Sequence, residues 1–183
     1  MLILASSSIS RVRLLEQAKI DFKQLKLDYQ ENLEKNVTPA FYVQNIVLQK
    51  EKQFLQLLKK DFQDCNLLFA DSIVCAGEKI LTKAQSKKEA YEMLALQDGK
   101  SASVLSAFLL IKPQQRVFSL SKTSFYFRNF DKNALKNYVE SDLYKGKAGC
   151  MMCEGFHRDF IIKQIGNLST ALGLDIQTLK AYL

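Results

Sequence analysis

The sequence predicts an α/β protein built around a mixed β-sheet, and two observations lead to this prediction. Short apolar runs alternate with stretches whose apolar residues recur at helical spacing, as in strand–helix–strand units. Later, two long strand-like runs (103–111 and 117–127) follow each other with only a proline-containing turn between them, which is typical of a hairpin. A sheet that combines crossover units with a hairpin contains both parallel and antiparallel pairs.

The length of the chain indicates one domain with a substantial core, and its charge favours polyanionic partners. Its 183 residues include 26 Lys and Arg against 19 Asp and Glu, a net charge of +7. Nucleotides, nucleic acid or an anionic surface would all suit this charge. No apolar run reaches the roughly 18 residues of a membrane span, and no signal peptide is recognisable at the N-terminus. We therefore expect a cytoplasmic protein without a membrane partner.

The opening of the chain predicts an anion-binding turn. Residues 2–5 read as a buried strand, serines interrupt it, and a helix begins near Ile9 with Ser8 as its N-cap. Such a turn leaves backbone N–H groups and the positive end of the helix dipole available for an anion. Arg11 adds a full positive charge. The plainer alternative is a capped helix with surface arginines, because no glycine signature of a phosphate loop is present.

The next elements follow in the same alternating order. A second strand (20–27) precedes a polar loop, and Thr38 followed by Pro39 predicts the start of a helix that ends near Leu58. Its predicted core face consists of Val43, Ile46, Val47, Phe54 and Leu58. The remaining predictions, in order, are a strand (67–76), a short strand (79–81), a helix opened by the capping box Ser86 to Glu89, the two hairpin strands, a helix from Asp131 to Val139, a strand (160–165) and a terminal helix (178–183).

Asp71 and Ser72 interrupt the apolar strand 67–76. A carboxylate inside so apolar a strand is costly unless it is paired or bound to a metal. Two interpretations stay open on the residues alone. Either Asp71 lies just past the strand end or the strand is two-faced, or Asp71 is a catalytic or metal-binding carboxylate.

Four cysteines, Cys65, Cys75, Cys150 and Cys153, are predicted to be buried, unreactive thiols. Cys150 and Cys153 with His157 also resemble half of a zinc site, which would need Cys65 or Cys75 as a further ligand. Zinc or dithiol chemistry is therefore kept as a minor alternative.

Four short motifs lie in register along the chain: Ser6-x-Ser8-x-x-Arg11-x-x-Leu14-Leu15, Ala70-Asp71-Ser72, Lys83 and Lys147-Ala148-Gly149. Together they resemble the Maf family of nucleoside triphosphate pyrophosphatases, and the resemblance extends from Leu2 to Gly173-Leu174. It implies a single Maf-like domain over residues 1–183 with a two-lobed, inosine triphosphatase-like α/β fold, in which helices flank a long, twisted, mixed sheet with a central cleft. It also implies hydrolysis of a nucleoside triphosphate to the monophosphate and pyrophosphate with Mg²⁺ or Mn²⁺.

The resemblance also implies roles for individual residues. Asp71 matches the family's catalytic acid, and we expect it to act as general base for the attacking water and as a metal ligand. Glu31 aligns with the family's loop carboxylate and is the second catalytic and metal candidate. The substrate-binding residues that the resemblance implies are Ser6, Ser8, Arg11, Lys50 and Lys83. Without the resemblance, Glu31 reads equally well as an exposed loop acid and Lys50 as a solvated helix residue.

Three positions bear on the choice of base. Glu154 stands in a segment where family members that prefer dTTP and UTP usually carry Gln, and this segment looks like the branch that acts on 7-methyl-GTP. Ser10 replaces a loop arginine that this branch also lacks. A carboxylate only accepts hydrogen bonds, which suits the adjacent N1–H and N2–H₂ donors of guanine. We predict a guanine-type base, read at Ser10, Ser72 and Glu154. Ser10 and Ser72 match neither branch closely, so a dTTP/UTP-type or broad range stays an alternative.

Some positions depart from the family pattern. The usual Ser-x-Ser-Pro-Arg-Arg has Ile9 and Ser10 here, Ala84 replaces the proline after Lys83, and Asp175 replaces the proline after Gly-Leu. These changes leave open whether phosphate binding and activity are weakened.

A function of another class is a non-catalytic basic protein that binds nucleic acid or a cell-division partner. The basic residues are scattered and not interleaved with aromatic residues, so we expect no nucleic-acid partner. Many family members are dimers, and a homodimer is the partner that the resemblance implies.

Overall fold

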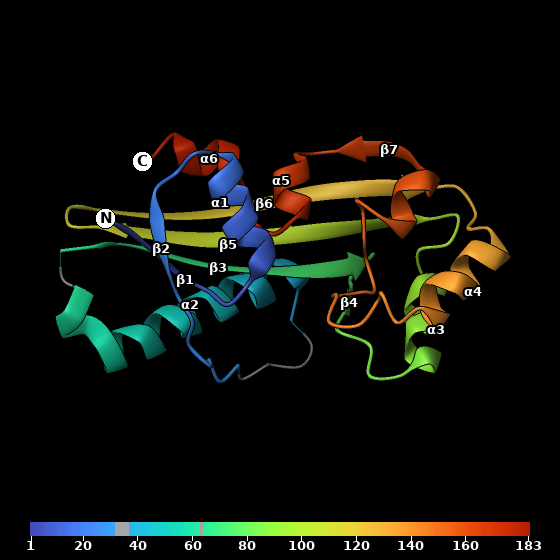
Figure 1. Cartoon of the computed structure of the whole chain (residues 1–183), viewed down its shortest axis with the longest axis horizontal. Coiled ribbons are helices and arrows are strands. Elements are labelled where there is room, and N and C mark those ends of the chain that lie inside the picture. Colours follow the sequence, from blue (N-terminus) through green and yellow to red (C-terminus); the bar gives the residue numbers. More distant parts are fainter. Residues whose placement is uncertain (32–36, 63) are drawn as a thin grey trace. The chain divides into compact units, whose positions relative to one another are not determined.

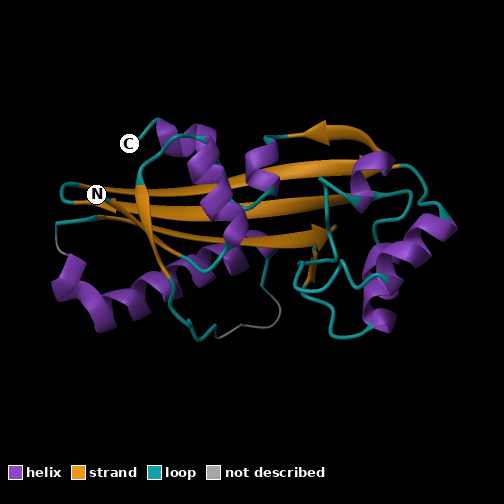
Figure 2. Ribbon diagram, viewed as in Figure 1, coloured by secondary structure: helices purple, strands orange, loops and turns teal. Residues whose placement is uncertain are grey.

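The computed structural model describes residues 1–31, 37–62 and 64–183. Helices and strands alternate along the chain (Figure 1), and Figure 2 distinguishes the two kinds of element in the same view. In order the elements are β1 (Leu2–Ala5), α1 (Ile9–Gln17), β2 (Phe22–Leu25), α2 (Pro39–Leu58), the 3₁₀ helix η1 (Lys59–Phe62), β3 (Asn66–Ala76), β4 (Lys79–Leu81), α3 (Lys87–Ala95), β5 (Ser101–Lys112), β6 (Gln115–Phe127), α4 (Lys132–Glu140), the 3₁₀ helix η2 (Phe156–Phe160), β7 (Ile161–Ile165), α5 (Leu168–Ala171) and α6 (Ile176–Lys180). Among these helices none is long and apolar enough to cross a membrane.

The strands in the described ranges form one seven-stranded sheet. Its order is β2-β1-β3-β5-β6-β7, with β4 paired to β3 outside this path. β1 is parallel to both β2 and β3, whereas β4 is antiparallel to β3 and β7 is antiparallel to β6. The parallel pairs join strands that are separated by a helix along the chain, as such connections require. The predicted α/β class with a mixed sheet flanked by helices is confirmed.

The chain divides into two compact units. Unit 1 consists of residues 1–72, 106–121 and 167–183, and unit 2 consists of residues 73–105 and 122–166. Strands β3, β5 and β6 each contribute residues to both units. The single pyrophosphatase domain and the central cleft between lobes stay predictions.

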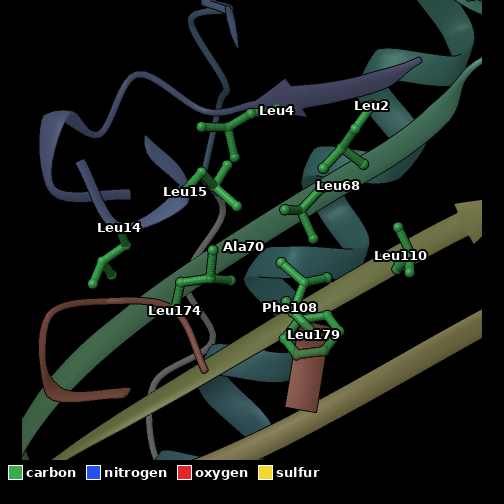
Figure 3. Close-up of a cluster of buried hydrophobic side chains, with 10 residues drawn as sticks. All are labelled: Leu2, Leu4, Leu14, Leu15, Leu68, Ala70, Phe108, Leu110, Leu174 and Leu179. Atoms are coloured by element: carbon green, nitrogen blue, oxygen red, sulfur yellow. The ribbon is translucent and has the colours of Figure 1, made fainter. Parts of the chain in front are cut away.

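The core of unit 1 explains why β3 is apolar on both sides. On one face, Leu68 and Ala70 belong to a buried cluster with residues from β1, α1, β5 and α6 (Figure 3); its members are Leu2, Leu4, Leu14, Leu15, Leu68, Ala70, Phe108, Leu110, Leu174 and Leu179. On the other face, Phe69 packs edge-on against Phe54 of α2, with ring centroids 5.3 Å apart. Each fully buried side chain of this size stabilises the fold by about 2 kcal/mol.

The helix starts follow the capping residues that the sequence predicts. Ser8 Oγ accepts a hydrogen bond from the backbone N–H of Arg11 at the start of α1. Helix α2 begins at Pro39 and ends at Leu58, as predicted. The capping box at α3 is confirmed in one direction: Ser86 Oγ accepts from Glu89 N, whereas the Glu89 carboxylate accepts from Gln85 N.

The C-terminal region differs from the prediction. The terminal helix α6 begins at Ile176 rather than Thr178, because the Asp175 carboxylate accepts hydrogen bonds from both the backbone N–H and the hydroxyl of Thr178 and caps the helix. A short helix, α5, precedes it and was not predicted.

Candidate active site

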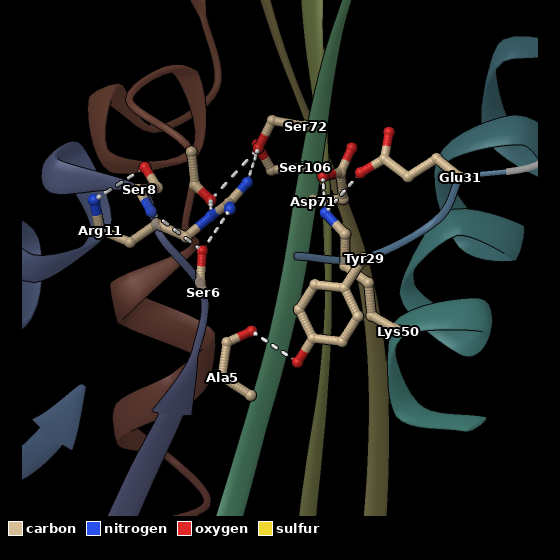
Figure 4. A network of polar contacts seen from close by, with 11 residues as sticks. Ala5, Ser6, Ser8, Arg11, Tyr29, Glu31, Lys50, Asp71, Ser72 and Ser106 are labelled. Atoms are coloured by element: carbon tan, nitrogen blue, oxygen red, sulfur yellow. Dashed lines mark hydrogen bonds and ion pairs between the residues drawn. The ribbon is translucent and has the colours of Figure 1, made fainter. Parts of the chain in front are cut away.

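Strand β3 runs without a break through Asp71 and Ser72. The interpretation that Asp71 lies just past the strand end is therefore wrong. Because successive side chains of a strand point to opposite faces, Asp71 and Ser72 belong to two different polar groups. Figure 4 shows these groups on the two sides of the strand.

On the α2 side, Lys50 holds two carboxylates. Its Nζ forms ion pairs with Asp71 Oδ1 and, at 3.1 Å, with Glu31 Oε1 (Figure 4). Lys50 is only 8% exposed, so the interpretation of this residue as a solvated helix lysine is wrong. A buried ammonium requires nearby negative charge, and the Tyr29 ring, whose centroid lies 5.9 Å from Nζ, adds a cation–π contact.

The backbone beside Glu31 is held on α2 by one side chain. Gln53 Oε1 accepts from Gln30 N at 2.9 Å, and Gln53 Nε2 donates to Gln30 O at 2.8 Å. These two hydrogen bonds tie the backbone of Gln30 to α2. Burial, together with the negative charges of Glu31 and Asp71, raises the pKa of the nearby Tyr42.

On the α1 side, protein acceptors enclose the Arg11 guanidinium. Its Nε donates to Gly173 O at 2.9 Å, Nη1 to Ser6 Oγ at 2.9 Å and Nη2 to Ser72 Oγ at 3.1 Å (Figure 4). Arg11 is 7% exposed, and among the ion pairs of the described ranges none involves it.

The negative charges that act on Arg11 are those of Asp71 and Glu31, and neither forms an ion pair with it. Burial lowers the pKa of Arg11, while the negative charges of Asp71 and Glu31 act in the opposite direction. Arginine nevertheless stays protonated in proteins. A full positive charge is therefore buried next to hydroxyl and carbonyl oxygens instead of a carboxylate.

Hydroxyl groups extend this side of the site. Ser6 Oγ also accepts from Ser8 N at 3.3 Å, which closes the turn before α1, and Gln24 Nε2 donates to Ser6 O at 2.8 Å. The structure thus brings Ser6, Ser8, Arg11 and Ser72 together. The hydroxyl of Ser72 is engaged with Arg11, and its role in base choice stays a prediction.

The remaining predicted residues, Ser10, Lys83 and Glu154, belong to neither of these two polar groups. Ser10 is exposed on α1. Lys83 and Glu154 belong to unit 2, and both are exposed. Lys83 forms an antiparallel bridge with Ala148, so two of the four motifs are neighbours within unit 2. The predicted roles of Ser10, Lys83 and Glu154 stay predictions.

The zinc alternative does not fit the buried histidine. His157 Nδ1 accepts from Met152 N at 3.1 Å, so Nε2 carries the proton and donates to Gln97 Oε1 at 3.2 Å. Both ring nitrogens are used in these hydrogen bonds. Burial raises the pKa of the Cys150 and Cys153 thiols to about 11, which makes reactive thiolate scarce at neutral pH.

The prediction of free, buried thiols is confirmed for Cys75, Cys150 and Cys153, while Cys65 is half-buried. In the described part of the chain, no group of three or more His, Cys, Asp and Glu side chains could hold a metal ion.

Comparison with known proteins identifies the family. The family model described as "Maf-like protein" matches residues 1–183. The chain belongs to the Maf family. A protein of Campylobacter jejuni subsp. jejuni (serotype O:23/36, strain 81-176), named nucleoside triphosphate pyrophosphatase, is 75% identical over 183 residues and is covered completely, as is this chain. A protein with the same name from Helicobacter pylori strain J99 is 35% identical over 178 residues, which are 97% of this chain and 92% of the relative.

Two carboxylates of this Maf protein suit a divalent cation. Asp71 Oδ1 and Glu31 Oε1 both pair with Lys50 Nζ, so the two carboxylates lie close to each other. Mg²⁺ is commonly bound by one or two carboxylates together with substrate phosphates, rather than by a complete cage of protein ligands. This donor set fits the predicted Mg²⁺ or Mn²⁺.

Proposed function

We propose that this Maf protein hydrolyses a nucleoside triphosphate to the monophosphate and pyrophosphate. The observation that carries the proposal is Arg11, a buried cation without a carboxylate partner among the described residues, in a serine-lined turn at the N-terminus of α1. An isolated buried charge is costly, and a phosphate is the anion that a helix N-terminus, hydroxyl groups and a guanidinium bind together. The names of the relatives from Campylobacter jejuni and Helicobacter pylori support the same activity.

Asp71 is our candidate for the general base. It is the carboxylate that the strand itself fixes, and the ion pair with Lys50 orients it. In the proposed step, the oxygen of a water molecule bonds to the α-phosphorus, and Asp71 accepts the proton from the water. The bond from the α-phosphorus to the oxygen that bridges it to the β-phosphate breaks, and pyrophosphate leaves with that oxygen. Lys50 and Arg11 then provide positive charge for the triphosphate from the two sides of β3. Lys83 is proposed as a third cation on the substrate.

We infer that Asp71 and Glu31 hold the divalent cation when it is present. When bound, Mg²⁺ or Mn²⁺ neutralises phosphate charge and polarises the phosphorus–oxygen bonds. Lys50 lies between the two carboxylates and keeps them close together in the absence of the ion.

A guanine-type base, with 7-methyl-GTP as one candidate, is the finer part of the proposal. It is supported by the acceptor-only chemistry of Glu154, which matches the two adjacent donors of guanine. The exposed Glu154 side chain is available to a ligand.

Pyrophosphate release from GTP, 7-methyl-GTP, dTTP and UTP tests both parts, with Mg²⁺, with Mn²⁺ and with a chelator. We expect release that depends on the metal and favours guanine nucleotides by at least about tenfold, the range that one well-placed hydrogen-bond pattern provides. No release from any nucleotide would contradict the activity. A tenfold preference for dTTP and UTP would contradict only the part about the base.

The variant Glu154→Gln addresses the base directly. It should shift the preference toward dTTP and UTP, because an amide both donates and accepts hydrogen bonds. Glu78→Gln is the matched control, since Glu78 is another exposed acid of unit 2.

A further inference from the structure

A chain of hydroxyl groups connects Arg11 with the C-terminal segment. Ser72 Oγ lies 2.8 Å from Ser106 Oγ, and Ser106 Oγ donates to Thr170 O at 2.6 Å. Ser72 Oγ in turn accepts from Arg11 Nη2. Figure 4 shows Ser106 next to Ser72. Ser106 belongs to none of the sequence motifs.

The groups at the two ends of this chain set the direction of its hydrogen bonds. A carbonyl only accepts and a guanidinium only donates, and each hydroxyl has one hydrogen. Because Ser106 gives its hydrogen to Thr170 O, it must accept from Ser72. Ser72 therefore points its hydrogen toward Ser106 and presents a lone pair to Arg11. Gly173 O, at 3.2 Å from Ser72 Oγ, is a longer alternative acceptor for the same hydrogen.

The chain is shielded from water, which would otherwise replace a missing partner. Ser106 is 3% exposed, and Thr170 and Arg11 are also buried. In such surroundings a polar group that loses its partner stays unsatisfied, and the network responds as a unit.

We propose that Ser106 is a positioning residue for Arg11. Acting through Ser72, it holds the guanidinium in the orientation that receives a phosphate group. Three of the five N–H donors of the guanidinium are used in the hydrogen bonds to Ser6, Ser72 and Gly173. One donor remains on each of the two terminal nitrogens, and this pair can bind a phosphate end-on. This inference rests on the proposed binding of a triphosphate by Arg11.

The same strand provides a matched control. Ser103 of β5 also pairs with a serine of a neighbouring strand, with its Oγ 2.9 Å from Ser124 Oγ. Ser103→Ala thus removes the same kind of hydrogen bond from the same strand without touching the chain that ends on Arg11.

The experiment measures binding of inorganic triphosphate by calorimetry and steady-state hydrolysis of the preferred nucleotide, both with the full chain. We expect Ser106→Ala to raise the Kd for triphosphate and the KM for the nucleotide by about five- to tenfold, the value of one buried hydrogen bond. The kcat should change by less than about twofold, because the phosphate contact forms before the chemical step. Ser106→Thr, which keeps the hydroxyl, should restore both constants.

A double-mutant cycle shows whether Ser106 acts through Ser72. In a Ser72→Ala background, Ser106→Ala should add little further loss. Additive losses, or equal effects of Ser106→Ala and Ser103→Ala, would overturn the inference. Ser106→Cys replaces the alanine variant if that variant does not fold.

The same measurements distinguish a failure of the proposed function from a failure of the proposed role of Ser106. If the native protein binds triphosphate but releases no pyrophosphate, the proposed function fails and the binding data still decide the role of Ser106. If the native protein hydrolyses nucleotides and Ser106→Ala leaves both constants unchanged, the activity stands and the inference fails.

Discussion

Asp71 and Ser72 are consecutive residues of β3, and each contacts a different buried cation. Asp71 pairs with Lys50 of α2, and Ser72 accepts a hydrogen bond from Arg11 of α1 at 3.1 Å. Because consecutive side chains of β3 point to opposite faces, this one strand positions a partner for each of the two cations. A register slip by one residue would exchange the two faces, so the parallel pairing of β3 with β1 also determines which cation meets the carboxylate.

The contact between Gln53 and the Gln30 backbone predicts that Gln53 positions Glu31. Gln53→Ala removes two hydrogen bonds at once. Because both are exposed to water, together they are worth about 1 kcal/mol or less. We expect the metal concentration for half-maximal pyrophosphate release to rise about two- to fivefold, with a small fall in thermal stability.

Gln56→Ala is the control for this prediction, because Gln56 is exposed on the same helix. Calorimetric binding of Mn²⁺ provides a readout that does not depend on turnover. Equal metal affinity in the two variants would show that Gln53 does not act on Glu31.

Asp175 is predicted to stabilise the C-terminal segment in place of the family's proline. Its carboxylate caps α6 through Thr178 and accepts a hydrogen bond from Ser121 of β6. Asp175→Ala should lower the free energy of unfolding by about 1 to 2 kcal/mol, as lost N-caps do. Asp175→Asn keeps a capping oxygen and should cost less.

The same residue gives a pH dependence. Burial alone would raise the pKa of Asp175, but the hydrogen bonds from Ser121 and Thr178 outweigh it, and the pKa is lowered. A carboxyl whose folded pKa is depressed stabilises the fold above its unfolded pKa of about 4, and this contribution disappears as the pH falls further. Urea unfolding of the native protein and of Asp175→Asn should therefore converge in acid. A constant difference down to the lowest pH would contradict this origin.

His157 predicts a second loss of stability on acidification, which begins at a higher pH than the loss caused by Asp175. Burial lowers its pKa from 6.5 to about 3, with a smaller opposite effect from the Met152 N–H. Between these values the unfolded chain binds a proton that the folded chain does not, so the free energy of unfolding falls as the pH decreases from about 6.5. The chain contains one histidine, so the slope between about pH 6.5 and pH 5 reports this residue. His157→Gln should flatten that slope, and an unchanged slope would contradict the prediction.

Much of the fold could be predicted because its signals are local. The Thr38-Pro39 pair and the apolar spacing predict both ends of α2, and Ser8 predicts the start of α1. The burial of Lys50 could not be predicted in this way. Helical periodicity treats a lysine as solvated, and the carboxylate that stabilises it lies 21 residues away along the chain, on another element.

The acceptors of Arg11 show the same limit more clearly. Gly173 O is a backbone group 162 residues away in sequence. Every residue has a carbonyl group, so the residue pattern cannot indicate which one accepts a hydrogen bond from Arg11. Asp175 stands where the family pattern has proline, and Asp is itself a preferred N-cap residue, so the start of α6 did have a local signal.

In the proposed reaction, Asp71 activates a water molecule beside a triphosphate held by Arg11 and Lys50. The most direct measurement is pyrophosphate release by Asp71→Asn, which keeps the size of the side chain and an oxygen for Lys50 but cannot accept the proton. Asp21→Asn, on the surface of unit 1, is the control. We expect a loss in kcat of at least about 100-fold for Asp71→Asn, the usual contribution of a general base, with unchanged folding and full activity of the control. Equal pyrophosphate release by Asp71→Asn and the native protein would contradict it.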